Sequence, residues 1–178
     1  PVLRAMRRHG SGDDVRRILD RLRGEVPHLT LRTTLLLGFP GETDADAAEA
    51  ARFVKEYKLA RLGAFTYSPE QGTHGWDLPN RVPADVARAR YEAVIAARDE
   101  VLRAEQRAWI GKDVEVLVDE SHPDSKTVVG RPVQDAPEVD LIAVVRDSRA
   151  KVGDCIMARV EDVDRESNLV AKAASRRT

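Results

Sequence analysis

Residues 35–43 read Leu-Leu-Leu-Gly-Phe-Pro-Gly-Glu-Thr, and this stretch decides how the first half of the chain is expected to fold. The apolar run 29–37 is short and ends abruptly at Gly38, which favours a buried strand over a helix. Asp46 follows Thr43 by three residues in a variant of the capping box, so a helix is expected to begin after Thr43.

A strand, a tight glycine loop and a helix N-terminus can present free backbone N–H groups to a ligand at the carboxyl end of the strand. The two glycines around Pro40 would let the backbone turn sharply and approach a bound group closely. A plain strand-to-helix turn is an equally favoured interpretation. The loop matches neither the P-loop nor Gly-x-Gly-x-x-Gly, so neither of those mechanisms is inferred.

A second strand is predicted at 61–67, after the helix that follows Thr43. Strands that alternate with helices are typical of a parallel α/β sheet or barrel. The loop 67–73 would leave the second strand at the same edge of the sheet as the glycine loop, because parallel strands end together. The sequence therefore places a candidate ligand site at this edge.

Besides a short basic helix at 1–8, two more helices are predicted, one on each side of this α/β pattern. The first is capped by Ser11 and ends at Gly24, with apolar residues recurring at helical spacing. The longest helix opens at Pro83 and runs to about Ile110. Its apolar stripe is expected to pack on the preceding domain.

After Gly111 the apolar period changes from 3.6 to 2. Five short strands are predicted, which suggests a small closed or partly open barrel of the OB kind. Cys155, at the start of the fourth, is interpreted as a small apolar core residue. The predicted strands are 114–118, 127–130, 139–145, 155–160 and 169–171.

Such barrels often bind nucleic acid, but the charge of this one argues against it. Residues 112–178 carry 11 Lys and Arg against 14 Asp and Glu, a net charge of −3. The barrel also has few aromatic side chains on which bases could stack. A basic protein partner is favoured over RNA.

The composition of the 178 residues, with 33% charged side chains and a net charge of −1, is that of a soluble globular protein. No apolar run approaches the roughly 20 residues of a membrane span, and no signal peptide is visible. A single cysteine excludes an internal disulfide and a cysteine cluster held by this chain alone, and it fits a cytoplasmic location.

Three segments together resemble the radical-SAM methylthiotransferase family. They are the glycine loop 38–43, residues 65–73 (Phe-Thr-Tyr-Ser-Pro-Glu-Gln-Gly-Thr) and residues 135–140 (Asp-Ala-Pro-Glu-Val-Asp). The last two are similar to the branch that methylthiolates the β-carbon of an aspartate in a small-subunit ribosomal protein, although Leu141 stands where that branch usually has glycine. The resemblance implies the C-terminal part of a partial parallel β/α barrel over 1–80, a connecting helix over 81–110, and an OB-like TRAM barrel over 111–178.

The family resemblance also implies cofactors and site residues. The family uses S-adenosylmethionine and 4Fe-4S clusters. In the family, the cofactor lies against the fifth strand of the barrel and the motifs that follow its fifth and sixth strands, which assigns cofactor binding to twelve positions of this chain. The family's TRAM segment assigns substrate docking to four positions. No catalytic or metal-binding residue is assigned. The cofactor positions are Arg32, Thr34, Gly38, Phe39, Pro40, Gly41, Glu42, Thr43, Tyr67, Ser68, Pro69 and Glu70, and the docking positions are Asp135, Pro137, Glu138 and Asp140.

One departure from the family is large. The family binds its radical-generating cluster through Cys-x-x-x-Cys-x-x-Cys and a second cluster through three further cysteines, and neither set is present in these 178 residues. Scattered residues cannot replace thiolate ligands. We therefore expect this chain to be inactive alone, to need the N-terminal part of the enzyme, and to expose unpaired sheet edges without it.

Three alternatives stay open at this stage. The chain could come from the branch of the family that modifies a tRNA adenosine, with tRNA the less favoured substrate. It could instead be a non-catalytic module that binds RNA or the ribosome, or a phosphate-binding α/β domain unrelated to radical chemistry.

Overall fold

The computed structural model describes residues 1–26 and 29–174. Pro27 and His28 lie outside the described residues, as does the end of the predicted barrel segment at 175–178. The chain forms two compact units, residues 1–101 and 102–178. Each unit has its own hydrophobic core, so each is described separately.

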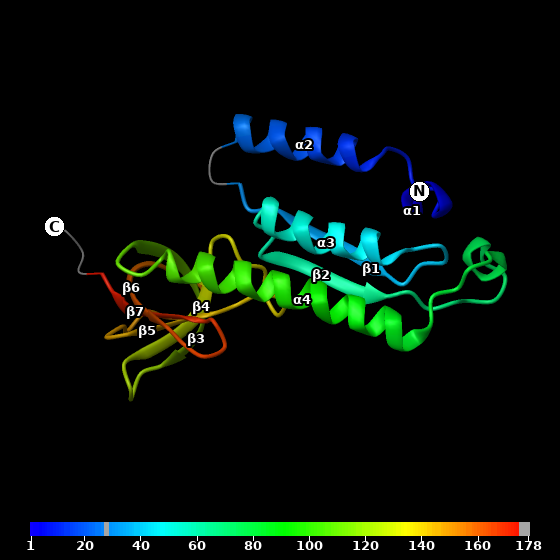
Figure 1. Cartoon of the computed structure of the whole chain (residues 1–178). Helices are drawn as coiled ribbons and strands as arrows, with labels where there is room; N and C mark the ends of the chain where they lie inside the picture. The colour runs from blue at the N-terminus through cyan, green and yellow to red at the C-terminus, as the bar shows by residue number, and fades with distance from the viewer. Residues whose placement is uncertain (27–28, 175–178) are drawn as a thin grey trace. The chain divides into compact units, whose positions relative to one another are not determined.

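The first unit is built around two parallel strands, which Figure 1 shows side by side. They pair in register from Arg32 opposite Arg61 to Leu37 opposite Thr66. The elements of this unit are α1 (Val2–Ala5), α2 (Gly12–Glu25), β1 (Arg32–Leu37), α3 (Asp44–Glu56), β2 (Arg61–Thr66), the 3-10 helix η1 (His74–Asp77) and most of α4 (Ala84–Arg107).

The two predicted helix caps are confirmed. In α3, the Thr43 side chain accepts from the Asp46 backbone N–H, and the Asp46 carboxylate accepts from the Thr43 N–H at 2.9 Å. Ser11 and Asp14 form the same reciprocal pair at the start of α2. Each box satisfies two N–H groups that a helix start would otherwise leave without partners.

One face of the two-stranded sheet is covered by α3 and α4. Alternate strand residues such as Leu37 and Leu62 share a buried cluster with Val54 of α3 and Val94 of α4. The stripe of the long helix therefore packs on the α/β unit, as the sequence predicted. By contrast, α2 buries none of its residues, and its apolar Ile18 is 58% exposed.

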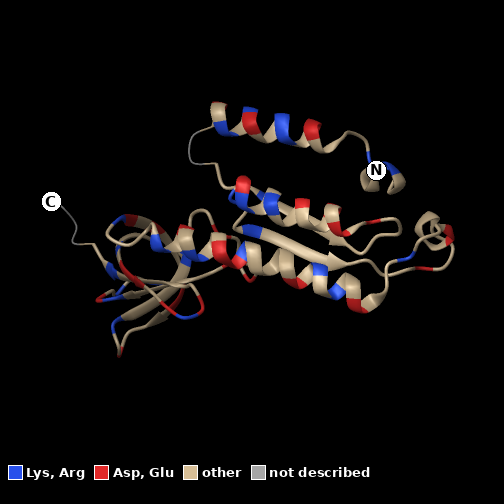
Figure 2. Cartoon of the chain, in the orientation of Figure 1, with Lys and Arg blue, Asp and Glu red and all other residues tan. Residues whose placement is uncertain are grey.

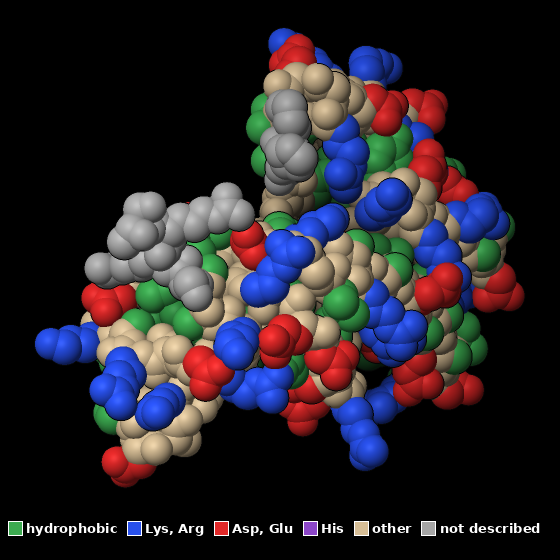
Figure 3. Space-filling view, turned by 90° about the vertical axis from the view of Figure 1, so that its left-hand side faces the viewer, with side chains coloured by type: hydrophobic (Ala, Val, Ile, Leu, Met, Phe, Trp, Pro, Cys, Tyr) green, Lys and Arg blue, Asp and Glu red, His purple; other side chains and the backbone are tan. Residues whose placement is uncertain are grey.

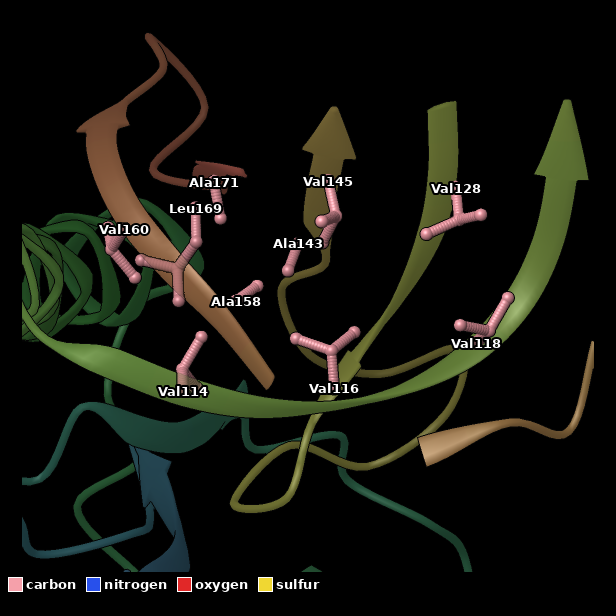
Figure 4. Close-up of a cluster of buried hydrophobic side chains, with 10 residues drawn as sticks. All are labelled: Val114, Val116, Val118, Val128, Ala143, Val145, Ala158, Val160, Leu169 and Ala171. Carbon is pink, nitrogen blue, oxygen red and sulfur yellow. The ribbon is translucent and has the colours of Figure 1, made fainter. Parts of the chain in front are cut away.

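The second unit is a closed barrel with strand order β3-β4-β5-β7-β6. Its interior is filled by valine and alanine side chains together with Leu169, and Figure 4 shows this cluster of ten residues. Closure removes the exposed strand edges that an open sheet would present. The strands are β3 (Asp113–His122), β4 (Thr127–Pro132), β5 (Ala143–Arg146), β6 (Cys155–Val163) and β7 (Leu169–Ala173).

Two predictions for the barrel were wrong. The third strand begins at Ala143 rather than at 139, because the preceding residues form a turn in which the Ala136 N–H donates to the Asp140 carboxylate at 2.7 Å. Cys155 is exposed, not a core residue. It shares its side of β6 with exposed Met157 and Arg159, while Ala158 and Val160 fill the interior.

The exposure of Cys155 can be tested with a thiol reagent, and the chain has no other cysteine to confuse the signal. We expect native protein to be labelled within about tenfold of the rate measured in denaturant, because an exposed thiolate reacts without prior unfolding. Protection by about a hundredfold or more would contradict the outward orientation of this strand position.

Candidate functional site

The two loops predicted to form the site are adjacent at the carboxyl edge of the sheet. The Tyr67 N–H donates to the Leu37 carbonyl at 2.8 Å, so the chain segments leave the strands together. The Phe39 ring then packs edge-on against the Tyr67 ring, with 5.0 Å between centroids. Gly75 lies directly against Tyr67, and a side chain there would overlap the phenol.

The backbone N–H groups of the glycine loop have partners inside the protein. The Gly38 N–H donates to both carboxylate oxygens of Glu42, at 3.0 Å each, and the Gly41 N–H donates to the Asn80 carbonyl at 2.9 Å. The Glu42 N–H donates to the Phe39 carbonyl. Of the two interpretations that the sequence left open, free N–H groups are contradicted for these three residues and a plain strand-to-helix turn is favoured, so a phosphate-binding loop is disfavoured.

Glu42 carries a buried charge that is paired with α4. Its side chain is 5% exposed, and its carboxylate accepts from Arg90 at 2.9 Å. Arg90 also donates to the Glu42 carbonyl at 3.1 Å and to Asp44 at 2.7 Å. Burial acts to lower the pKa of Arg90, but hydrogen bonds to Asp44 and Glu42 outweigh it, so the pKa of the guanidinium is raised.

The twelve predicted cofactor positions divide by exposure. Gly38, Phe39, Pro40 and Glu42 are buried, and Tyr67 is partly buried, so these residues shape the edge from within. The others are exposed at the surface of the edge or on the sheet face opposite the helices. The exposed positions are Arg32, Thr34, Gly41, Thr43, Ser68, Pro69 and Glu70.

The sheet face opposite α3 and α4 brings together residues from both strands. A Cβ placed on Gly63 would lie 3.6 Å from the Thr34 hydroxyl, so Thr34 points to the same side as the odd-numbered residues of β2. Phe65, two residues on from Gly63, is 62% exposed on that side. Phe65 was not among the predicted positions, although the alternation along β2 placed it on the same side as Gly63.

The four predicted docking residues lie in one loop of the barrel unit but differ in accessibility. Asp135 is buried and Asp140 is partly buried, which makes both part of the turn that holds the loop. Pro137 and Glu138 are exposed. The loop also exposes two valines, Val133 at 78% and Val139 at 72%.

Figure 2 shows acidic and basic residues interspersed along the chain, and Figure 3 shows the same mixture on one face.

No group of three or more His, Cys, Asp or Glu side chains within residues 1–26 and 29–174 could hold a metal ion. The single cysteine lies exposed on the barrel. These residues therefore do not fit an iron–sulfur cluster, which needs several thiolates around one point. Within the same described ranges, no helix is both long and apolar enough to cross a bilayer.

The barrel defines the class of protein. Residues 110–173 match the family model of the TRAM domain, which covers all five strands of the closed barrel. The second unit therefore matches a TRAM domain, and an α/β unit precedes it in the chain.

The relatives are more specific. Proteins named "Ribosomal protein uS12 methylthiotransferase RimO" match most of the chain. The protein from Anaeromyxobacter sp. (strain Fw109-5) is 39% identical over 98% of this chain and 37% of its own length. The protein from Synechococcus sp. (strain CC9902) is 42% identical over 78% of this chain and 30% of its own length.

The chain is therefore a homologue of the RimO methylthiotransferases, as its motifs indicated, and its TRAM domain is consistent with their C-terminal portion. It spans only 37% and 36% of the lengths of two of these relatives.

The close approach of α4 to the glycine loop can be tested with two matched substitutions. Gly38 and Gly41 both have positive φ, +79° and +85°, but a Cβ on Gly38 would overlap that of Ala87, whereas one on Gly41 meets nothing within 4 Å. We expect Gly41→Ala to lower the free energy of unfolding by about 1 kcal/mol through backbone strain alone. Gly38→Ala should lower it by roughly 2–4 kcal/mol, because overpacking adds to the strain. Equal losses in urea unfolding would contradict the close packing.

The cap of α3 gives the protein a pH dependence. Side-chain and backbone hydrogen bonds from Thr43 hold the pKa of Asp46 below its ordinary value of 3.8. The ionised carboxylate therefore stabilises the fold above the unfolded-state pKa, and this contribution is lost as the pH falls through the lower folded-state value. We expect Asp46→Ala to lower the free energy of unfolding by about 1 kcal/mol near pH 6. The difference from wild type should disappear towards pH 2; a difference that does not change with pH would contradict the role of the ionised cap.

Proposed function

We propose that this chain is the cofactor-edge and substrate-docking part of an enzyme that methylthiolates the β-carbon of an aspartate in ribosomal protein uS12. The observation that carries the proposal is the adjacency of the two family motifs. Phe39 and Tyr67, one from each motif, are in ring contact at the edge of the sheet. The similarity to proteins named uS12 methylthiotransferases over nearly the whole chain supports the choice of reaction.

S-adenosylmethionine would lie against the edge of a β/α barrel of which β1 and β2 form part. Arg32 and Thr34 on the open sheet face, and Ser68, Pro69 and Glu70 after β2, are the predicted residues exposed enough to contact it. Gly41 and Thr43 are exposed where the glycine loop meets α3. When bound, the cofactor supplies a methyl group for sulfur and the source of a substrate radical.

The buried residues of the edge have a different role. Gly38, Phe39, Pro40 and Glu42 hold the loop in shape and keep water out from beneath it. The partly buried Tyr67 extends this packing to the second loop through the contact of its ring with Phe39. The site is thus a preorganised surface rather than a set of free N–H groups, which favours a nucleoside with an uncharged ring over a phosphate.

The 4Fe-4S clusters would be held by cysteines on polypeptide outside these 178 residues. The sequence has a single cysteine, which is exposed on the barrel, and the residues that the structure describes offer no ligand set for a cluster. We therefore propose that the chain is inactive alone and acts in the cytoplasm with the remaining polypeptide of the enzyme.

The TRAM barrel would dock the substrate protein through the loop 133–142. Exposed Glu138 lies between exposed Pro137 and Val139, which combines a negative charge with apolar contact area. The net charge of −3 over 112–178 suits a basic ribosomal protein and disfavours RNA. A tRNA substrate, or a non-catalytic role in binding RNA, is the alternative that the next experiment separates.

The test is a titration of the whole chain with purified uS12 and, separately, with tRNA. We expect uS12 to bind at least about tenfold more tightly at physiological salt, because the acidic barrel repels the phosphate backbone. Equal or tighter binding of tRNA would overturn the assignment to a ribosomal-protein substrate.

Two charge reversals locate the docking surface. Glu138→Lys is expected to weaken uS12 binding by about tenfold. Asp124→Lys makes the same change in the exposed turn at the opposite end of β4, and is expected to change binding by less than about threefold. If both variants weaken binding equally, net charge and not the loop directs docking.

A further inference from the structure

Arg90 of α4 donates hydrogen bonds to three acceptors in and next to the glycine loop. It donates to the Glu42 side chain at 2.9 Å, to the Glu42 carbonyl at 3.1 Å, and to Asp44, the first residue of α3, at 2.7 Å. The planar guanidinium carries several donors in a fixed fork, so one side chain can fix three acceptors relative to one another.

The ion pair matters because of where it lies. The Glu42 and Arg90 side chains are 5% and 12% exposed, whereas Asp44, the second partner of Arg90, is 93% exposed. A buried carboxylate that loses its partner is strongly disfavoured, but an exposed one is solvated by water. The Glu42 contact is therefore the one on which the loop depends.

Glu42, held by Arg90, in turn fixes the loop backbone at Gly38. Both of its carboxylate oxygens accept from the Gly38 N–H at 3.0 Å, and Gly38 holds a left-handed conformation with φ +79°. Ala87, one turn before Arg90 on α4, lies against the same glycine. The helix thus holds the loop at two points, Gly38 by packing and Glu42 by charge.

The next residue connects the loop to the second motif. Phe39 follows Gly38 directly and packs its ring against Tyr67. Any movement of Gly38 would therefore shift Phe39 relative to the segment that follows β2. Arg90 contributes to the arrangement of both motifs without lying in either of them.

We propose that Arg90 is a positioning residue: through Glu42 it fixes the loop 38–43, and with it the contact between Phe39 and Tyr67, at the edge to which we assign the cofactor. The assignment of a ligand to this edge rests on the proposed function, but the fixing of the loop does not. Asp44 serves as the outer anchor of the guanidinium and has the smaller effect.

The test measures amide hydrogen exchange by NMR in the full chain, for wild type, Arg90→Gln, Arg90→Lys and the control Asp44→Asn. The Gly38 N–H reports on the loop, and the Val54 N–H in α3 reports on the stability of the whole unit. We expect Arg90→Gln to speed exchange at Gly38 by about tenfold or more relative to Val54, because the amide loses its fixed carboxylate acceptor. Asp44→Asn should change this ratio by less than about threefold.

Arg90→Lys is expected to fall between Arg90→Gln and wild type, since it keeps the charge for Glu42 but loses the fork. If Arg90→Gln leaves the ratio of exchange at Gly38 to exchange at Val54 unchanged, whether both amides speed up equally or neither does, the positioning role is overturned. Equal acceleration would leave Arg90 only a contribution to stability.

Binding of S-adenosylmethionine to the same variants, measured by calorimetry, separates this inference from the proposed function. A drop in affinity of about tenfold in Arg90→Gln, with little change in Asp44→Asn, would support both. If wild type binds no S-adenosylmethionine, the cofactor assignment fails, while the exchange ratio alone still decides whether Arg90 positions the loop.

Discussion

A carboxylate buried beneath a glycine loop is the constraint on which the α/β unit depends. Glu42 is enclosed between the backbone of its own loop and the guanidinium of Arg90, and its two oxygens satisfy an N–H that the turn would otherwise leave without a partner. Removing either partner would leave a charge or a donor buried without compensation. The loop, the start of α3 and the first third of α4 therefore hold one another in place.

This constraint changes how the glycine loop is interpreted. A strand, a glycine turn and a helix start commonly bind anions with free N–H groups. Here acidic side chains occupy that position, because Glu42 and Asp46 accept from the Gly38 and Thr43 N–H groups. In our proposal, this rigid edge binds a nucleoside through its shape and through side chains on the neighbouring sheet face, such as Thr34 and Phe65.

The features that the sequence predicted well depend on residues close together in the chain. The capping boxes at Ser11 and Thr43 need only a partner three residues away. The adjacency of the two loops follows from parallel pairing alone. The pairing of Glu42 with Arg90 could not be found in this way, because 48 residues separate them and packing of α4 brings them together. Cys155 was misplaced for a local reason, since Arg159 on the same side of the strand already indicated which side faces water.

The most direct measurement is the change in backbone amide chemical shifts when S-adenosylmethionine is added to the isotopically labelled chain. We expect saturable shifts of the amide signals of Thr34, Phe65 and Ser68. The amide signals of the barrel strands, such as that of Val145 in β5, should not shift. No shifts at saturating cofactor, or shifts confined to residues 102–174, would contradict the assignment of the sheet edge as the cofactor site.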